Sequence, residues 1–453
     1  MNAVTKKQNS FIKGAIIVSV GGLIAKIIGA FYRIPLTNLL KSEGLGIYQT
    51  VFPVYAVLLT FSSSGVPSAI AKLVSAGEDG EKILARSLSV FLPLGLIGTT
   101  FLCGFSVPLA RLQGNPDAKY AYVALSPSVF FVSAIACFRG YFQGKSDMRP
   151  TAASQIVEQI VKLAFGIVLC YFLRNDYAYA GAAACFAVTL SELAAVIYLS
   201  EKLKSSGVSC KPLQKGYSLR KIAATVAPIT LSAILLPLAR TFDSFTVVNL
   251  IGKYSDRATA LYGVYTGGVE SVIGVPIALC YGAAAAALPQ ISAAAAKSDR
   301  SESKEKTVEA IALTAISAAI FSAFIAFFAS TITKVLFGGL SAEDSDVSVR
   351  LLRLASVNVF SLSLIQTCAA VLVGFGKPYA SCAFLFLGLI AKAISEIILL
   401  KIPEINVFGA LYSDILCYLI ALFGDLVYII VINAKTRTDD ERKTDKNRQI
   451  PNR

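Results

Sequence analysis

Twelve charged residues of this chain lie within long hydrophobic stretches, where a charge is costly. A charged side chain at the centre of a bilayer costs about 2.5–3.5 kcal/mol on insertion scales, so such residues are expected to face a polar interior and to serve a function. Five of them are basic: Lys26, Arg33, Lys162, Arg240 and Lys392. Seven are acidic: Glu158, Glu192, Asp243, Glu270, Glu396, Asp414 and Asp425.

Several of these charges have the spacing of intrahelical ion pairs. Residues three or four positions apart lie on the same face of a helix, where opposite charges attract. Three intramembrane pairs are therefore predicted: Glu158 with Lys162, Lys392 with Glu396, and Arg240 with Asp243. Such pairs either line a polar cavity or neutralise each other and hold helices together, and the spacing alone leaves both interpretations open.

Lys26 and Arg33 differ from these pairs because their own hydrophobic stretch contains no carboxylate. Seven residues apart, they fall within about 20° of the same helical face. Two cations on one stripe favour an anionic ligand, and a diphosphate offers several acceptor oxygens to Lys and Arg. We expect Lys26 and Arg33, joined by Lys162 and Arg240, to bind a diphosphate or another anionic head group.

Composition indicates which elements must carry these residues. The chain has 453 residues, 55% of them hydrophobic and 15% charged, with a mean hydropathy of +0.66. Soluble domains are about one quarter charged, so this is a polytopic membrane protein. A helix that crosses a bilayer needs about 20 mostly apolar residues. Twelve such spans are predicted, at residues 12–36, 46–72, 84–110, 118–142, 150–173, 177–200, 221–250, 259–294, 308–337, 349–374, 379–400 and 405–433.

Lysine and arginine also predict the orientation, because they are enriched in cytoplasmic loops. Of the 42 Lys and Arg residues, 27 fall on the side of the N-terminus, 10 on the opposite side and 5 within spans. Both termini are therefore expected in the cytoplasm. Most of the net charge of +14 is then a topological signal and a contact for anionic lipids, and no nucleic-acid partner is needed to explain it.

The polar stretch 201–221 divides the predicted spans into six and six. Because six is even, both halves enter the membrane in the same direction, as parallel repeats do. The predicted fold is all-α, with two parallel six-helix bundles. Its parts are an N-lobe at 1–203, a cytoplasmic inter-lobe loop at 204–220, a C-lobe at 221–433 and a polar cytoplasmic tail at 434–453.

Several functions are excluded by what the sequence lacks. The chain has no histidine, which removes His-ligated metals, His-based triads and histidine proton relays. It has no GxxxxGK[ST] loop for ATP. We therefore predict that the protein is not an enzyme and has no cofactor, and that Na+ or H+ would couple to transport through carboxylates. A monomer is expected.

Four segments carry a resemblance to a known family. They are RGYFQGKSDMRP with TAASQIVEQIVKL at 139–163, RIPLTNLL at 33–40, GLGIYQ at 44–49, and SSGVPSAIAKLVS at 63–75. Together they resemble the stage V sporulation protein B family. This family belongs to the multidrug/oligosaccharidyl-lipid/polysaccharide (MOP) superfamily, which also contains the lipid II flippase and the MATE exporters.

The resemblance implies a flippase that moves an undecaprenyl-diphosphate-linked oligosaccharide or a peptidoglycan precursor across the membrane by alternating access. Basic residues of the first span line the cavity in related flippases, and Lys26 and Arg33 match those positions. The lipid II flippase also resembles a cation-coupled carrier with a sodium site among spans seven, eleven and twelve. The acidic candidates for such a site here are Asp243, Glu396 and Asp414.

Two alternatives remain open. The second span lacks the basic residues of lipid II flippases, and the second half of the chain is rich in carboxylates, as expected of a sodium- or proton-coupled multidrug exporter of the same superfamily. A membrane scaffold of an envelope-synthesis complex, with the intramembrane charges acting only between helices, is the second alternative.

Overall fold

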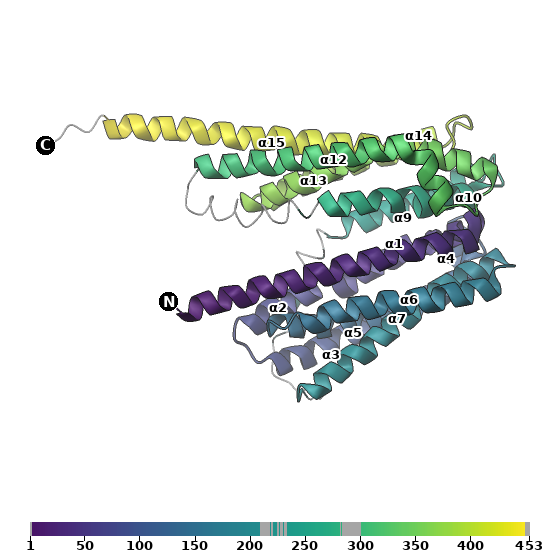
Figure 1. Cartoon of the computed structure of the whole chain (residues 1–453), viewed down its shortest axis with the longest axis horizontal. Helices are drawn as coiled ribbons and strands as arrows, with labels where there is room; N and C mark the ends of the chain where they lie inside the picture. The colour runs from purple at the N-terminus through teal and green to yellow at the C-terminus, as the bar shows by residue number, and fades with distance from the viewer. Residues whose placement is uncertain are drawn as a thin grey trace. The chain divides into compact units, whose positions relative to one another are not determined.

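The computed structural model describes residues 2–208, 218, 221–223, 226, 230, 233–280, 282 and 300–448. These residues are helical almost throughout and include no strand (Figure 1). Contacts divide the chain into two compact units. Unit 1 comprises Met1–Gly267 and Leu336–Asp344, and unit 2 comprises Gly268–Val335 and Ser345–Arg453.

Unit 1 contains the first part of the chain. Its elements are α1 (Asn2–Leu59), η1 (Thr60–Ser64), α2 (Val66–Ser75), α3 (Gly80–Gly104), α4 (Ser106–Leu112), α5 (Ala118–Gly144), α6 (Arg149–Leu173), α7 (Tyr177–Ser205), α9 (Leu235–Ile251) and α10 (Ala258–Tyr262), followed by η2 (Gly263–Val269), which runs into unit 2. α1 joins two predicted spans and has a non-helical residue between them, Lys41, with φ 54° and ψ −166°. A lysine at positive φ is strained, so Lys41 marks a sharp break in the helix axis.

Unit 2 contains the long helices of the second part. They are α12 (Arg300–Leu336), α13 (Ala342–Gly374), α14 (Pro378–Leu399) and α15 (Phe408–Arg448). α14 packs along α15. A hydrophobic core joins α13 and α15, and it includes Leu364 of α13 with Cys417 and Leu422 of α15.

Nine helices among the described residues are long and apolar enough to cross a membrane. They correspond to nine of the twelve predicted spans. Predicted spans one and two lie within α1 and the segments that follow it, and α9 covers the second half of span seven. The multi-pass helical membrane architecture is therefore confirmed, whereas the number twelve, the two parallel bundles, the lobe boundaries and the cytoplasmic location of both termini stay predictions.

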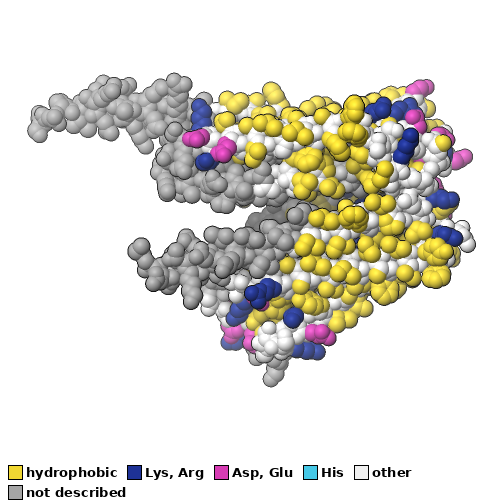
Figure 2. All heavy atoms as spheres, viewed as in Figure 1, with side chains coloured by type: hydrophobic (Ala, Val, Ile, Leu, Met, Phe, Trp, Pro, Cys, Tyr) yellow, Lys and Arg dark blue, Asp and Glu magenta, His cyan; other side chains and the backbone are white. Residues whose placement is uncertain are grey.

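The surface of the described helices is that of a protein surrounded by lipid. Large hydrophobic side chains are exposed there, among them Phe172 (75% exposed), Phe327 (79%) and Phe423 (72%). Lys, Arg, Asp and Glu gather near the helix ends in Figure 2. Exposed apolar area of this extent is stable only in contact with hydrocarbon or another apolar surface.

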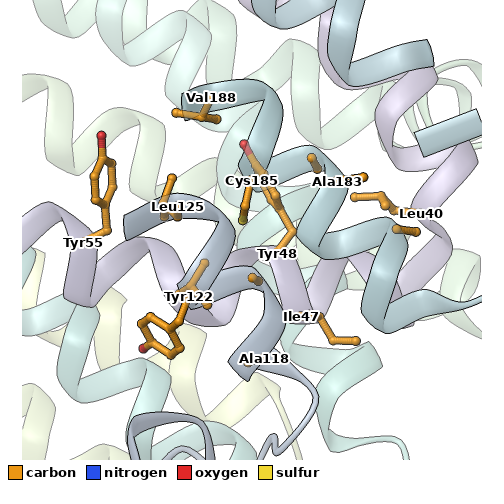
Figure 3. Close-up of a cluster of buried hydrophobic side chains, with 14 of the residues drawn as sticks. Leu40, Ile47, Tyr48, Tyr55, Ala118, Tyr122, Leu125, Ala183, Cys185 and Val188 are labelled. Atoms are coloured by element: carbon orange, nitrogen blue, oxygen red, sulfur yellow. The ribbon is translucent and has the colours of Figure 1, made fainter. Parts of the chain in front are cut away.

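The core of unit 1 holds α1, α5, α6 and α7 together. Tyr48 of α1, Tyr122 of α5 and Cys185 of α7 belong to one cluster of buried side chains, and each is at most 5% exposed (Figure 3). Glycines let neighbouring helices approach closely, since a Cβ added at Gly144 of α5 would lie 2.5 Å from Cβ of Val74 in α2. This packing fixes the helices that carry the charges described next.

Candidate functional site

Arg33 on α1 is a predicted intramembrane cation of unit 1 whose side chain the structure describes. Its Nη1 donates a hydrogen bond of 3.0 Å to the backbone carbonyl of Gly267, 234 residues away in η2. The side chain is half-buried. Arg33 is therefore held by a neutral acceptor and retains further N–H donors for a ligand.

Lys26 is the other cation predicted on this stripe. Its backbone lies in α1, but its side chain lies outside the described residues. Its role in anion binding stays a prediction.

A second group of charges lies where α5, α6 and α7 meet. Arg139, near the C-terminal end of α5, forms an ion pair with Glu158 of α6 and donates from Nε to Ser154 Oγ at 2.9 Å. A turn of four residues joins the two helices, so residues far apart in sequence come to lie side by side. Arg139 and Glu158 are 17% and 13% exposed, so the pair is shielded from most of the surrounding medium.

This arrangement gives Glu158 a different partner from the one predicted. The i,i+4 spacing predicted Lys162 on the same helix, but the guanidinium of Arg139 reaches the carboxylate from the neighbouring helix. Lys162 Nζ lies instead over the ring of Tyr32, 5.7 Å from its centroid. A planar guanidinium that donates to both Glu158 and Ser154 fixes the carboxylate better than a flexible ammonium would.

These residues form one electrostatic group, which we call the unit 1 charge cluster: Arg33, Arg139, Glu158, Lys162 and Glu192. The charge of Lys162 interacts with those of Arg33, Glu158 and Glu192, and the charge of Glu192 interacts with that of Arg139. With three basic and two acidic members the cluster carries an excess of positive charge when all five are ionised. It is partly accessible, since every member is neither fully buried nor fully exposed.

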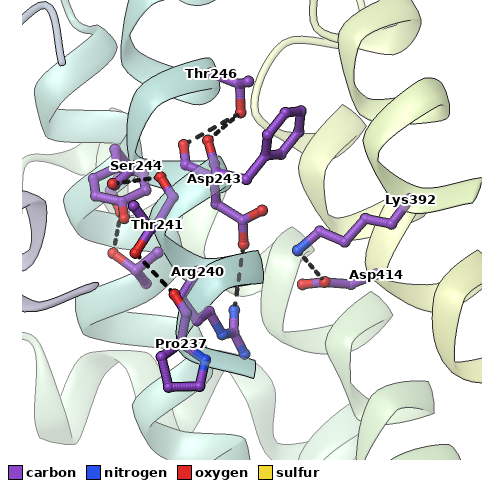
Figure 4. A network of polar contacts seen from close by, with 11 residues as sticks. Pro237, Arg240, Thr241, Asp243, Ser244, Thr246, Lys392 and Asp414 are labelled. Carbon is purple, nitrogen blue, oxygen red and sulfur yellow. Dashed lines mark hydrogen bonds and ion pairs between the residues drawn. The ribbon is translucent and has the colours of Figure 1, made fainter. Parts of the chain in front are cut away.

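Two predicted site residues lie on α9 of unit 1. Arg240 Nη1 is 3.8 Å from Oδ2 of Asp243, at the predicted i,i+3 spacing (Figure 4). Asp243 is 1% exposed, whereas the side chain of Arg240 is 34% exposed. Arg240 therefore shields a buried carboxylate while its own head group stays accessible.

The predicted residues of unit 2 lie on α14 and α15. Lys392 Nζ is 2.7 Å from Oδ1 of Asp414, and the two side chains are 4% and 2% exposed (Figure 4). Glu396 is fully buried one helical turn beyond Lys392. The structure thus adds an interhelical partner, Asp414, that intrahelical spacing did not indicate for Lys392.

Asp425 of α15 is another of the predicted intramembrane acids, and the sequence assigned it to no site. It is fully buried, and its Oδ2 accepts a hydrogen bond of 2.8 Å from Ser381 of α14. Unit 2 therefore holds three buried carboxylates and one buried lysine on two packed helices. No group of three or more metal-binding side chains occurs among the residues that the structure describes.

Arg139 is the member of the unit 1 charge cluster that the sequence analysis did not name. Its signal was present, because it opens the segment RGYFQGK and falls within a predicted span. It lies close to the end of the predicted span 118–142, where a charge can also belong to the following loop.

A family model described as "Polysaccharide biosynthesis protein" matches residues 11–295. Stage V sporulation protein B of Bacillus subtilis (strain 168) is 28% identical over 304 residues, which cover 63% of this chain and 58% of that relative's length. The lipid II flippase MurJ of the same organism is 23% identical over 454 residues, covering 93% of this chain and 83% of MurJ.

Solved structures show the same fold. A multidrug resistance MATE family transporter of the MOP superfamily, in an inward-facing conformation, aligns with a TM-score of 0.76 at 17% identity, over 90% of this chain and 99% of that one. Lipid II flippase MurJ in an inward closed conformation aligns with a TM-score of 0.71 at 13% identity, over 97% and 94%.

These matches bear on the class of protein. The family is one of transporters and flippases and not of catalytic enzymes, as predicted, and its members are multi-pass bacterial membrane proteins. Because the family model matches more than half of the chain, the chain belongs to the polysaccharide biosynthesis protein family.

Proposed function

We propose that this protein is a flippase that moves an undecaprenyl-diphosphate-linked oligosaccharide, or a lipid II-like peptidoglycan precursor, across the bacterial cytoplasmic membrane by alternating access. The observation that carries the proposal is the unit 1 charge cluster. It combines an excess of positive charge with partial access. Among the described residues, Arg139 forms an ion pair with Glu158, whereas Arg33 contacts a backbone carbonyl and Lys162 an aromatic ring.

A diphosphate suits these two cations. Hydrogen bonds from Lys or Arg to phosphate oxygens are about twice as strong as bonds between neutral groups. Both current contacts, a backbone carbonyl for Arg33 and an aromatic ring for Lys162, are weaker than a phosphate oxygen would be. The relatives named as a lipid II flippase and a sporulation protein support a lipid-linked precursor as the cargo.

We further propose that transport is coupled to a cation, Na+ or H+, through Asp243, Glu396 and Asp414. All three carboxylates are buried, at 1%, 0% and 1% exposure. A buried carboxylate that is alternately charged and neutralised is a suitable carrier of a cation. The expected working unit is a monomer that contacts anionic lipids at its cytoplasmic face and uses no ATP.

The test uses the purified full chain in vesicles loaded with a fluorescent lipid-linked precursor. Arg33→Ala and Lys162→Ala should each lower the initial rate of flipping about tenfold to a hundredfold, as expected for the loss of one or two charge-assisted hydrogen bonds. Lys253→Ala, an exposed lysine outside the spans, serves as the matched control and should flip at the wild-type rate. Wild-type flipping in a folded Arg33→Ala/Lys162→Ala protein would contradict the proposal.

The carboxylate-rich unit 2 favours one alternative function, a multidrug exporter coupled to sodium or protons. That function predicts an ion flux stimulated by organic cations and unaffected by lipid-linked sugar. A scaffold predicts no flux of either kind and a partner protein that copurifies. The vesicle assay, run with both substrates, separates the three functions.

A further inference from the structure

The hydrogen bond from Arg33 ends on an unusual segment of the chain. Gly267 belongs to η2, a π-helix over Gly263–Val269 that interrupts the predicted eighth span. π-Helical turns are rare, and they occur frequently at functional sites. The Gly267 carbonyl is thus held by a side chain from another helix at a point where the helix is irregular.

η2 is also the point at which the chain leaves unit 1. Gly267 is the last residue of the first stretch of unit 1, and Gly268 is the first residue of unit 2. Two consecutive glycines in an irregular helix form a backbone with few steric restraints. A change of angle between the helix segments on either side of η2 is therefore least costly here.

On the unit 1 side, η2 and α10 are packed tightly against the second part of α1. A Cβ added at Gly267 would lie 2.5 Å from Cγ of Leu45, and one added at Gly263 would lie 2.4 Å from the carbonyl oxygen of Ser42. A Cβ at Gly46 would meet the carbonyl of Thr259. Close packing thus holds η2 against α1 from Gly263 to Gly267, so a change of angle can occur only beyond Gly267, after the carbonyl that Arg33 binds.

We propose that Arg33 is a coupling residue: in the empty transporter it locks η2 through the Gly267 carbonyl, and a bound diphosphate draws the guanidinium away and frees η2 to bend. This inference rests on the proposed function for the identity of the ligand. The side chain of Arg33 would then both bind the substrate and release η2, the segment at which the chain passes from unit 1 to unit 2.

The relative strength of the two acceptors drives the exchange. A diphosphate oxygen carries negative charge and forms a stronger, shorter bond to a guanidinium than a neutral carbonyl does. Lys162 adds a second positive charge that interacts with Arg33 and would hold the same anion near it. The diphosphate therefore binds more tightly to the state in which Arg33 has left Gly267. Because a ligand shifts an equilibrium toward the state that it binds more tightly, binding favours the released form of η2.

Arg33→Lys separates binding from coupling. The lysine keeps the positive charge for the diphosphate but lacks the planar fork of donors that reaches Gly267. We expect its maximal flipping rate to fall about tenfold while the half-saturating concentration changes less than about threefold, since one hydrogen bond to a charged group is lost. Lys162→Met should show the opposite pattern, a raised half-saturating concentration with a smaller change in the maximal rate.

Hydrogen–deuterium exchange of the full chain in detergent tests the lock directly. Without ligand, Arg33→Lys should raise amide exchange in residues 263–269 about fivefold, as expected for the loss of one hydrogen bond. Undecaprenyl diphosphate should produce the same rise in the wild type and no further rise in Arg33→Lys. Gly274→Ala is the matched control, because a Cβ at that glycine of the same span would meet no atom within 4 Å.

The outcomes separate this inference from the proposed function. Binding of undecaprenyl diphosphate that leaves exchange at 263–269 unchanged would overturn the lock and leave the flippase intact. Equal exchange in ligand-free wild type and Arg33→Lys would overturn it as well. Failure of the wild type to bind the diphosphate, measured by native mass spectrometry on the same sample, would contradict the proposed function itself.

Discussion

In unit 2, Lys392 and Asp414 lie 2.7 Å apart with side chains 4% and 2% exposed, whereas in unit 1 Arg33 and Lys162 are half-buried and contact a carbonyl and an aromatic ring. Both regions place basic residues within spans. They differ in what neutralises the charge. In unit 2 the carboxylate of Asp414 neutralises Lys392 at hydrogen-bond distance. In unit 1 the carboxylate of Glu158 forms its ion pair with Arg139, and not with Arg33 or Lys162.

The difference separates two uses of an intramembrane charge. A pair that is closed and dry cannot exchange its partner without a large cost, because each ion would be left alone in a medium of low dielectric constant. A cation held by a weak, partly accessible acceptor can exchange that acceptor for a ligand at little cost. We therefore propose substrate contact for Arg33 and Lys162 of unit 1. For the buried carboxylates, Asp243 of unit 1 and Glu396 and Asp414 of unit 2, we propose structural or cation-linked roles.

The largest expected effect is on the stability of unit 2. Lys392→Ala would leave Asp414 buried without the ammonium that it contacts, and we expect a loss of about 3–5 kcal/mol in the free energy of unfolding. Thermal unfolding of the detergent-solubilised protein measures it. Lys401→Ala, an exposed lysine just beyond α14, is the matched control and should unfold as the wild type does. Wild-type stability of Lys392→Ala would contradict the view that the ion pair of unit 2 is closed and structural.

A smaller loss is expected from the interhelical pair of unit 1. Arg139→Ala removes an ion pair to Glu158 and a hydrogen bond to Ser154, and hydrogen bonds to charged groups contribute about 1.5–3 kcal/mol each. We expect a loss of about 2 kcal/mol, since the pair is partly exposed. Exposed Arg111→Ala is the control. A double Arg139→Gln/Glu158→Gln variant should recover part of the loss, and if it is less stable than Arg139→Ala the pair is not the cause.

The smallest effect on stability is expected for Lys162. Lys162→Met keeps a side chain of similar size and removes the contact of the ammonium with Tyr32, which contributes about 0.5–1 kcal/mol. It also removes the repulsion from Arg33 and the attraction to Glu158 and Glu192, which oppose each other. Its unfolding temperature should stay close to that of the wild type even though flipping is impaired. A loss of stability as large as that of Lys392→Ala would show that Lys162 is structural and would remove the distinction between the units.

Much of the architecture could be predicted from the sequence because a membrane span is defined locally. Twenty apolar residues form a helix in lipid regardless of their neighbours, since every backbone group must be hydrogen-bonded within the segment. Nine predicted spans match described helices for this reason. The break at Lys41 and the π-helix η2 were not predicted, because a single strained lysine or one extra residue per turn leaves no periodic signal.

The candidate site was predictable in its membership and not in its contacts. The free-energy cost of placing a charge in a bilayer was enough to identify Arg33, Lys162, Lys392 and Asp414 as candidate site residues. Their partners come from other helices: Gly267 for Arg33, Tyr32 for Lys162 and Asp414 for Lys392. Helical spacing offers only partners on the same helix, so it assigned Lys162 to Glu158 and left out Arg139.

The sequence by itself therefore determined that this is a multi-pass helical membrane protein with charges inside its spans, because hydrophobicity and charge act through each segment's own composition. Only the tertiary structure decided which charge meets which partner. Those contacts depend on helix packing over separations of up to 234 residues, and packing is fixed by the shapes of all the side chains between them. The link between Arg33 and η2, on which the proposed coupling depends, belongs to this second class.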